Sequence, residues 1–132
     1  MTNRLWLCLA ATALVAGAQA DDDLRALQKI CDYIKVDDRS SLRRTLDETE
    51  VDLRREYGDF KCGKYSLLRY AALSGSLEAA TLLVSKAGKK AIGEKEGDGM
   101  NAIEWAQKQA DGADAGLKPK IKAVVELMQS KQ

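Results

Sequence analysis

An internal repeat is the feature of this sequence that most constrains its fold. Residues 66–72, SLLRYAA, have the same pattern as residues 101–107, NAIEWAQ, which begin 35 residues further along the chain. A period of roughly 20 to 50 residues is typical of proteins in which each unit is one supersecondary element that buries its apolar face against the next. The repeat therefore predicts a stack of similar units.

The first unit is predicted to be a pair of helices. Apolar residues recur at intervals of three and four between Leu24 and Ile34, which indicates an amphipathic helix over residues 23–35. The side chains of residues 37–40 are suited to cap a second, short helix that ends near Thr49. The two helices are expected to form a hairpin.

Two more helix pairs are predicted further along the chain. One runs from Ser66 to Gly88, with a tight turn at residues 74–76, and the other follows Asn101, which is suited to cap its first helix. Pro119 is tolerated in the first turn of the last helix. Because no strand-like alternation of any length occurs, the predicted fold class is all-α.

Two irregular segments separate these pairs. Residues 51–64 are charged and aromatic and contain two glycines, and residues 89–99 mix lysine, glutamate and glycine without helical spacing. Both segments are predicted to be extended loops, which we call the first and second fingers.

The middle unit, residues 65–88, resembles the ankyrin repeat. The family pattern Thr-Pro-Leu-His-x-Ala-Ala, with a following Gly, paired leucines and a terminal Gly, is met by Ala71 and Ala72, by Gly75 and by the leucines at 82 and 83. The alanines allow close helix packing, and Gly75 permits a sharp turn. The resemblance implies an ankyrin-like solenoid of about three helix-turn-helix repeats with intervening finger loops, at about residues 23–58, 59–93 and 94–132.

The resemblance is uneven along the chain. Leu67 stands where the family has proline, Arg69 and Glu104 stand where it has histidine, and the third pair has a longer turn. Terminal repeats are commonly atypical because they present a polar outer face. A tetratricopeptide-like stack is an alternative, since hydrophobic periodicity does not separate helix-pair solenoids.

Residues 1–20 have the pattern of a secretory signal peptide. Arg4 precedes an apolar run over residues 5–16, and the segment ends in Ala-Gln-Ala before three aspartates. We expect cleavage after Ala20, which leaves residues 21–132 as one domain that is periplasmic or secreted and does not insert into a membrane. An uncleaved N-terminal anchor is the alternative.

Two cysteines, Cys31 and Cys62, remain after that cleavage. An oxidising compartment and an even count predict a disulfide between them, which would stabilise the fold by roughly 3 to 4 kcal/mol through loop closure. Two separate buried thiols are the alternative. A metal site is not expected, because two thiols in a sequence without histidine are a poor ligand set.

The residue inventory argues against several kinds of chemistry. The absence of histidine from the sequence excludes Ser-His-Asp and Cys-His nucleophile arrangements. No phosphate-binding loop pattern is present, and 21 basic against 20 acidic residues provide no bulk charge for nucleic-acid binding. We therefore assign no catalytic residue and no cofactor, and a small hydrolase that uses carboxylates is the outside alternative.

Recognition of a protein partner is the remaining class of function. The resemblance implies that a partner lies across the finger tips and the exposed ends of the first helix of each pair, and rings and arginines in the fingers are typical interface anchors. Tyr57 and Phe60 fit an inward packing role equally well, and Trp105 is expected in the core. The predicted partner-binding residues are Tyr33, Arg54, Arg55, Tyr57, Phe60, Tyr65, Leu73, Ser74, Lys95, Asp98, Met100, Lys108 and Gln109, with Asp32 and Gly63 beside them.

The sequence thus predicts an exported, monomeric and non-enzymatic protein-protein interaction module. Its partner is expected to be another exported protein, and an immunity-type inhibitor of a toxin or enzyme is the concrete version we favour. An envelope-stress or housekeeping adaptor for another periplasmic protein is the alternative.

Overall fold

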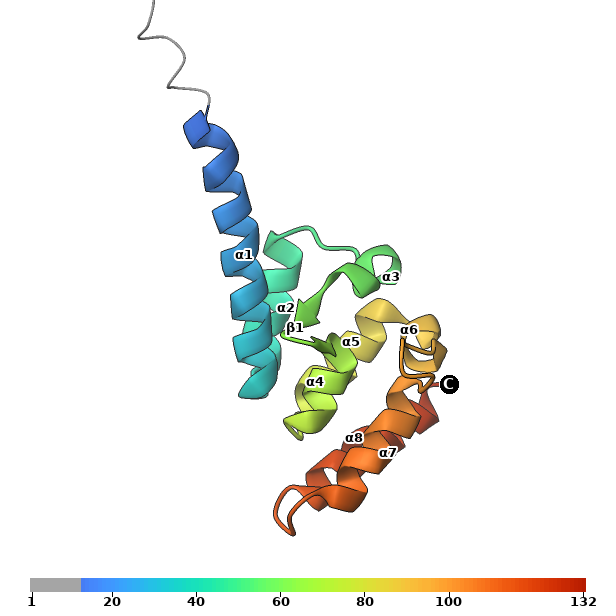
Figure 1. Cartoon of the computed structure of the whole chain (residues 1–132). Helices are drawn as coiled ribbons and strands as arrows, with labels where there is room; N and C mark the ends of the chain where they lie inside the picture. The colour runs from blue at the N-terminus through green and yellow to red at the C-terminus, as the bar shows by residue number, and fades with distance from the viewer. Residues whose placement is uncertain (1–12) are drawn as a thin grey trace, which may run out of the picture.

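The chain folds into a mostly helical stack (Figure 1). The structure is a computed structural model that describes residues 13–132, with side chains described from Asp22 onward. Within those residues there are eight α-helices, one 3₁₀ turn and two short strands. In chain order they are α1 (Ala13–Lys35), α2 (Arg39–Glu48), α3 (Leu53–Glu56), η1 (Tyr57–Asp59), β1 (Lys61–Cys62), β2 (Tyr65–Ser66), α4 (Leu67–Leu73), α5 (Leu77–Ala87), α6 (Lys89–Gly93), α7 (Ala102–Gly112) and α8 (Lys118–Ser130).

Six of the helices are arranged as three pairs in a row. α1 packs on α2, α4 on α5 and α7 on α8, and the middle pair lies between the outer two (Figure 1). In one layer α4 contacts both α1 and α7, and in the other α5 contacts both α2 and α8. The predicted helix pairs are therefore present, and the middle pair has a neighbour on each side.

Capping side chains define where several helices begin. At α2, Asp38 accepts a hydrogen bond from Ser41 N at 3.1 Å, and its hydrogen bonds from Ser41 hold the pKa of this carboxyl below the ordinary value. At α7, Asn101 and Glu104 accept hydrogen bonds from each other's backbone N at 2.9 and 3.2 Å, which completes a capping box. Pro119 lies in the first turn of α8. These three predicted helix starts are confirmed.

One continuous core joins the three pairs. Helix α4 contributes Leu67, Leu68, Ala71 and Ala72, and none of these side chains has exposed surface. Because the two alanines are small, the flanking helices can pack closely against α4 at native density. The buried face of α4 therefore lies at the centre of the core.

The turn between α4 and α5 depends on Gly75. Its φ is +64°, and a Cβ added there would lie 2.7 Å from the Cβ of Lys120 in α8. A left-handed residue that also touches another helix is a position that favours glycine. The tight turn predicted from the sequence therefore serves the contact between the second and third pairs as well.

The two fingers contain more regular structure than the sequence pattern indicates. The first holds α3, η1 and a hairpin in which β1 and β2 pair antiparallel around Gly63. The second begins with α6, which buries Ala91 and Ile92. Elements of two to five residues are too short for periodicity to reveal them. The all-α prediction is thus correct for the bulk of the described residues and misses this small sheet.

Helix α1 begins at Ala13 rather than near residue 23, and it passes Ala20 without interruption. Residues 1–12 lie outside the described residues, so most of the predicted signal peptide does too, and its cleavage stays a prediction. No helix within residues 13–132 is both long and apolar enough to cross a membrane.

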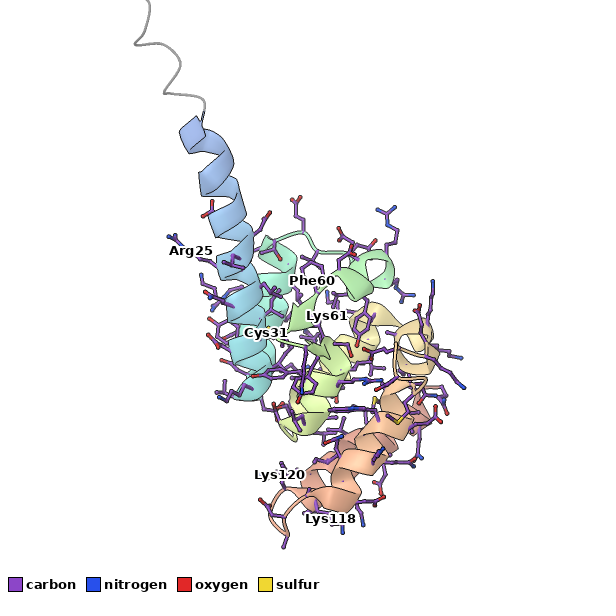
Figure 2. All side chains as sticks on the ribbon, in the orientation of Figure 1. Arg25, Cys31, Phe60, Lys61, Lys118 and Lys120 are labelled. Carbon is purple, nitrogen blue, oxygen red and sulfur yellow. A yellow bond between two sulfur atoms is a disulfide. The ribbon has the colours of Figure 1, made fainter. Side chains whose placement is uncertain are left out.

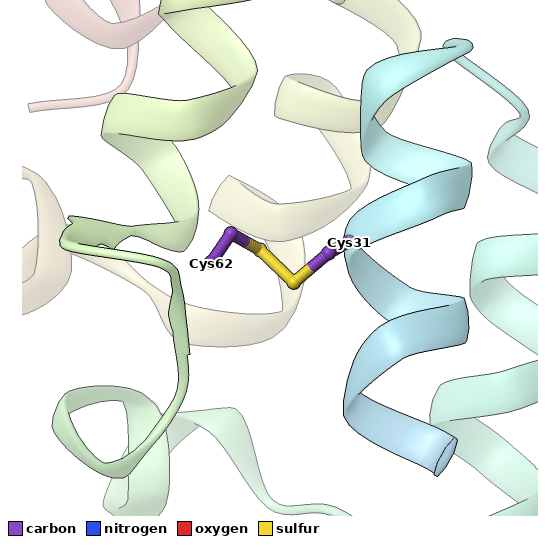
Figure 3. The surroundings of a disulfide bond; sticks show 2 residues. All are labelled: Cys31 and Cys62. Atoms are coloured by element: carbon purple, nitrogen blue, oxygen red, sulfur yellow. A yellow bond between two sulfur atoms is a disulfide. The ribbon is translucent and has the colours of Figure 1, made fainter. Parts of the chain in front are cut away.

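The predicted disulfide between Cys31 and Cys62 is confirmed (Figure 3). It joins α1 to strand β1, and the two Cα atoms are 5.6 Å apart although 31 residues separate them in sequence. An isolated hairpin with strands this short is marginally stable. The covalent link therefore fixes the position of the hairpin beside α1.

We expect Ala72→Leu to lower the free energy of unfolding by about 1 to 3 kcal/mol, because a larger side chain at this fully buried position overpacks the contact of α4 with its neighbours. Chemical denaturation followed by circular dichroism measures the change. Ala115→Leu is the matched control at an exposed site and should leave stability nearly unchanged. Equal stability of the two variants would contradict the packing described for α4.

We expect the double variant Cys31→Ser, Cys62→Ser to lose about 2 to 5 kcal/mol of unfolding free energy, since the open chain gains conformational entropy. Denaturation with and without a thiol reductant measures this. Reductant should bring the wild-type protein to the stability of the double variant and leave the double variant unaffected. A wild-type protein that responds as little as the variant would show that the disulfide does not stabilise the fold.

Candidate protein-binding surface

A groove of about 730 Å³ lies between α1, the hairpin and the start of α4. One wall is the outer face of α1, the other is the hairpin, and the Cys31–Cys62 disulfide links the two (Figure 3). Cys31 lies on α1 and Lys61 on the adjacent hairpin (Figure 2). The lining residues are Leu24, Leu27, Gln28, Cys31, Asp32, Lys61, Cys62, Gly63, Tyr65 and Tyr70.

Aromatic rings form the wall of the groove that faces α1. The half-buried Tyr65 stacks on Tyr70, with ring centroids 6.5 Å apart and planes at 26°. Behind it lies Trp105 of α7, whose ring centroid is 5.6 Å from that of Tyr65. Trp105 is buried, as predicted, and the Arg69 guanidinium lies 5.1 Å from its ring centroid. These ring contacts hold Tyr65 in a fixed position on the groove wall.

Arg69 ties the second finger to α4. It is 7% exposed, and its guanidinium donates two hydrogen bonds to the Asp98 carboxylate, at 2.6 and 2.8 Å, and one to Met100 O at 3.0 Å. Its Nε lies 2.7 Å from Glu96 Oε2 as an ion pair without hydrogen-bond alignment, and Ser66 Oγ donates to the same oxygen at 2.9 Å. A bidentate arginine-carboxylate pair of this kind fixes geometry as well as charge.

The contacts within this cluster shift the pKa values of Arg69 and Asp98. Hydrogen bonds from Arg69 hold the pKa of the Asp98 carboxyl well below its usual range, and the hydrogen bonds to Asp98 raise the pKa of Arg69. Asp98 was predicted as a partner contact, yet its carboxylate faces Arg69. Its hydrogen bonds are those of a structural tie.

Tyr57 and Phe60, the aromatic residues of the first finger, both pack against the core. The hydroxyl of Tyr57 accepts a hydrogen bond from Leu68 N at 2.9 Å, and burial raises the pKa of this tyrosine to about 12. From the sequence, a surface role and a packing role were equally expected for these two rings. Their contacts with the core support the packing role.

The other predicted partner-binding residues lie on several separate surfaces. Leu73 and Ser74 are half-buried at the end of α4, and Tyr33 lies between α1 and α2 in a different hollow. Arg54 and Arg55 are exposed on α3, Lys95 is exposed in the second finger near the half-buried Met100, and Lys108 and Gln109 lie on α7. Of the predicted set, only Tyr65 lines the groove, together with the adjacent Asp32 and Gly63.

Four residues that line the groove were not predicted as site residues from the sequence: Leu24, Leu27, Lys61 and Tyr70. The two leucines share a helical stripe with Ile30 and Ile34, which are buried, so their spacing indicates a core face. Leu24 is nevertheless 58% exposed, because α1 extends past the helices that cover its later turns. The stripe itself contains no signal for where that cover ends.

Residues 30–94 match a family described as "Protein of unknown function (DUF3718)". That stretch runs from the middle of α1 to the end of α6 and includes both cysteines of the disulfide. No curated protein and no solved structure matches the chain. Within the described residues, no group of three or more histidine, cysteine, aspartate or glutamate side chains is placed to hold a metal ion.

The assignment to the ankyrin-repeat family is wrong, because the family that matches this chain is not an ankyrin-repeat family. The residues on which it was based have packing roles that many close helix pairs require. Ala71 and Ala72 are buried at the helix contact, and Gly75 makes a left-handed turn against α8. Small residues at such contacts do not identify one family.

We expect Asp98→Asn to lower the melting temperature at neutral pH, because it removes the charge that pairs with buried Arg69. The folded-state pKa of Asp98 lies below the ordinary value of 3.8. The charge therefore stabilises the fold fully above about pH 4, and this contribution is lost as the pH falls further towards the folded pKa. The wild-type advantage over the variant should thus shrink between about pH 4 and pH 2 in thermal scans.

Asp111→Asn is the matched control, since Asp111 is exposed on α7. It should leave the melting temperature close to that of the wild-type protein at neutral pH and between about pH 4 and pH 2. If Asp98→Asn behaved like this control at neutral pH, the pairing with Arg69 would not contribute to the stability of the fold.

Proposed function

We propose that this chain is a non-catalytic module that binds another exported protein. The observation that carries the proposal is the groove beside α1, in which the half-buried ring of Tyr65 stacks on Tyr70 and contacts the buried ring of Trp105. Tyrosine side chains that are rigid before binding are effective anchors at protein interfaces.

The groups whose pKa is clearly displaced have structural partners. Asp38 caps α2, Tyr57 packs against the core, and Arg69 pairs with Asp98 to hold the second finger to α4.

Export is part of the proposal and rests on two features. Residues 1–20 have the pattern of a signal peptide, and the Cys31–Cys62 disulfide is of the kind that persists in oxidising compartments. Both features support a periplasmic or secreted location, with a partner from the same compartment. An immunity-type inhibitor of a toxin or enzyme is the version we favour, because a small rigid module suits stoichiometric recognition.

Affinity capture from the exported fraction of the source cells tests the proposal. The bait is the purified, disulfide-bonded protein, and it is compared with the groove variant Tyr70→Asp and with Glu126→Lys on the α7–α8 face, away from the groove. We expect one partner that the wild-type protein and Glu126→Lys retain and Tyr70→Asp loses by at least tenfold. Circular dichroism verifies that each variant is folded.

The activity of the captured partner then separates the two kinds of module. An inhibitor should lower that activity at a stoichiometric ratio, whereas an adaptor should leave it unchanged or raise it. Capture of the same proteins by all three baits would contradict binding through the groove. Turnover by the protein itself that is lost on replacing its carboxylates would contradict the non-catalytic assignment.

A further inference from the structure

The groove beside α1 contains one of the exposed large apolar side chains of the described residues; the others, Val36 and Leu77, lie outside its lining. Leu24 is 58% exposed in the groove, and it lies in the same lining as Leu27 and the two tyrosines. The hollows at the two ends of the stack have a different character. The one between α7 and α8 is lined mainly by polar side chains, Gln107, Asp111, Lys122, Glu126 and Gln129, and the one between α1 and α2 contains Asp22, Arg25, Lys29, Arg44 and Glu48.

The charges of the groove are divided between its walls. Lys61 lines the hairpin wall. Lys64 lies in the turn of the hairpin, outside the lining, and its Nζ is 5.4 Å from the centroid of the Tyr65 ring. Asp32 and Gln28 lie on the α1 wall. Within the part of the chain that the structure describes, neither lysine and no atom of Asp32 takes part in an ion pair. Lys61 in the lining and Lys64 beside it therefore offer two cations that form no ion pair with another described residue, next to an aromatic surface.

The shape of the groove suits a peptide segment. Its volume lies within the roughly 300 to 1,000 Å³ typical of ligand sites. Its α1 wall runs along the helix from Leu24 to Asp32, which is longer than two helical turns. Since the disulfide holds this wall to the hairpin, the walls keep their spacing without a ligand.

We propose that the groove binds a short acidic segment of the partner protein, in which a carboxylate side chain lies next to a large apolar one. The apolar side chain packs between Leu27 and the rings of Tyr65 and Tyr70, and the carboxylate pairs with Lys61 and Lys64. This inference rests on the proposed function and names the chemistry that the binding site recognises. The basis is charge complementarity with the hairpin lysines, together with the leucine and tyrosine side chains in the mixed polar and apolar lining.

Selection from a phage-displayed library of random twelve-residue peptides tests this chemistry. The target is the purified, disulfide-bonded protein, and the affinities of enriched peptides are measured by fluorescence anisotropy. We expect enriched sequences to combine aspartate or glutamate with leucine, phenylalanine or tryptophan. Their affinity should fall as the salt concentration rises from 50 to 500 mM, by roughly tenfold, because exposed charge pairs are screened.

Charge reversal at the hairpin wall is the sharper test. Lys61→Glu with Lys64→Glu should weaken the enriched peptides by roughly tenfold or more. Lys118→Glu with Lys120→Glu reverses the same charge at the start of α8, far from the groove, and should change affinity by less than about twofold (Figure 2). Leu27→Asp should abolish peptide binding, because it removes the apolar side chain against which the peptide packs.

Three results would overturn the inference. They are enrichment of peptides without acidic residues, an affinity that Lys61→Glu with Lys64→Glu leaves unchanged, and an affinity that does not depend on salt. The salt series uses only the wild-type protein, so it tests the inference even if a variant fails to fold. Capture of a groove-dependent exported partner together with any of these results would leave the proposed function standing and remove only the acidic segment.

Discussion

Close packing around α4 is the constraint on which the rest of the structure depends. This helix is seven residues long, yet it contacts α1 on one side and α7 on the other. Ala71 and Ala72 lie fully buried where these helices meet, and Gly75 brings the following turn against α8. Because α4 also carries Arg69 and Tyr70, its position sets both the anchor of the second finger and one side of the groove.

The irregular segments are held by a few strong links rather than by their own secondary structure. The first finger is tied to α1 by the Cys31–Cys62 disulfide and to α4 by the hydrogen bond from Leu68 N to the Tyr57 hydroxyl. The second finger is tied to α4 by Arg69. A domain of this size has a modest core, so such links contribute a large share of the order in segments that cannot bury much apolar surface.

The sequence predicted local structure correctly where a residue type favours one particular local conformation or bond. The caps at Asp38 and Asn101, the turn at Gly75 and the disulfide follow from such rules. The family assignment failed, because alanines and glycines at helix contacts reflect packing that is not specific to one family. The groove was not predictable for another reason. Leu24 and Ile30 share one stripe, and only the length of the neighbouring helices decides that the first is exposed and the second buried.

The groove lining stays partly apolar and uncovered in the folded chain. Leu24 is 58% exposed there, although burial of apolar surface stabilises a fold by about 25 cal/mol per Å². The Cys31–Cys62 disulfide and the buried Trp105 hold the α1 and Tyr65 sides of this surface in place. An arrangement that maintains exposed apolar surface in a fixed shape lowers the cost of recognition, because most of the ordering is complete before a partner binds.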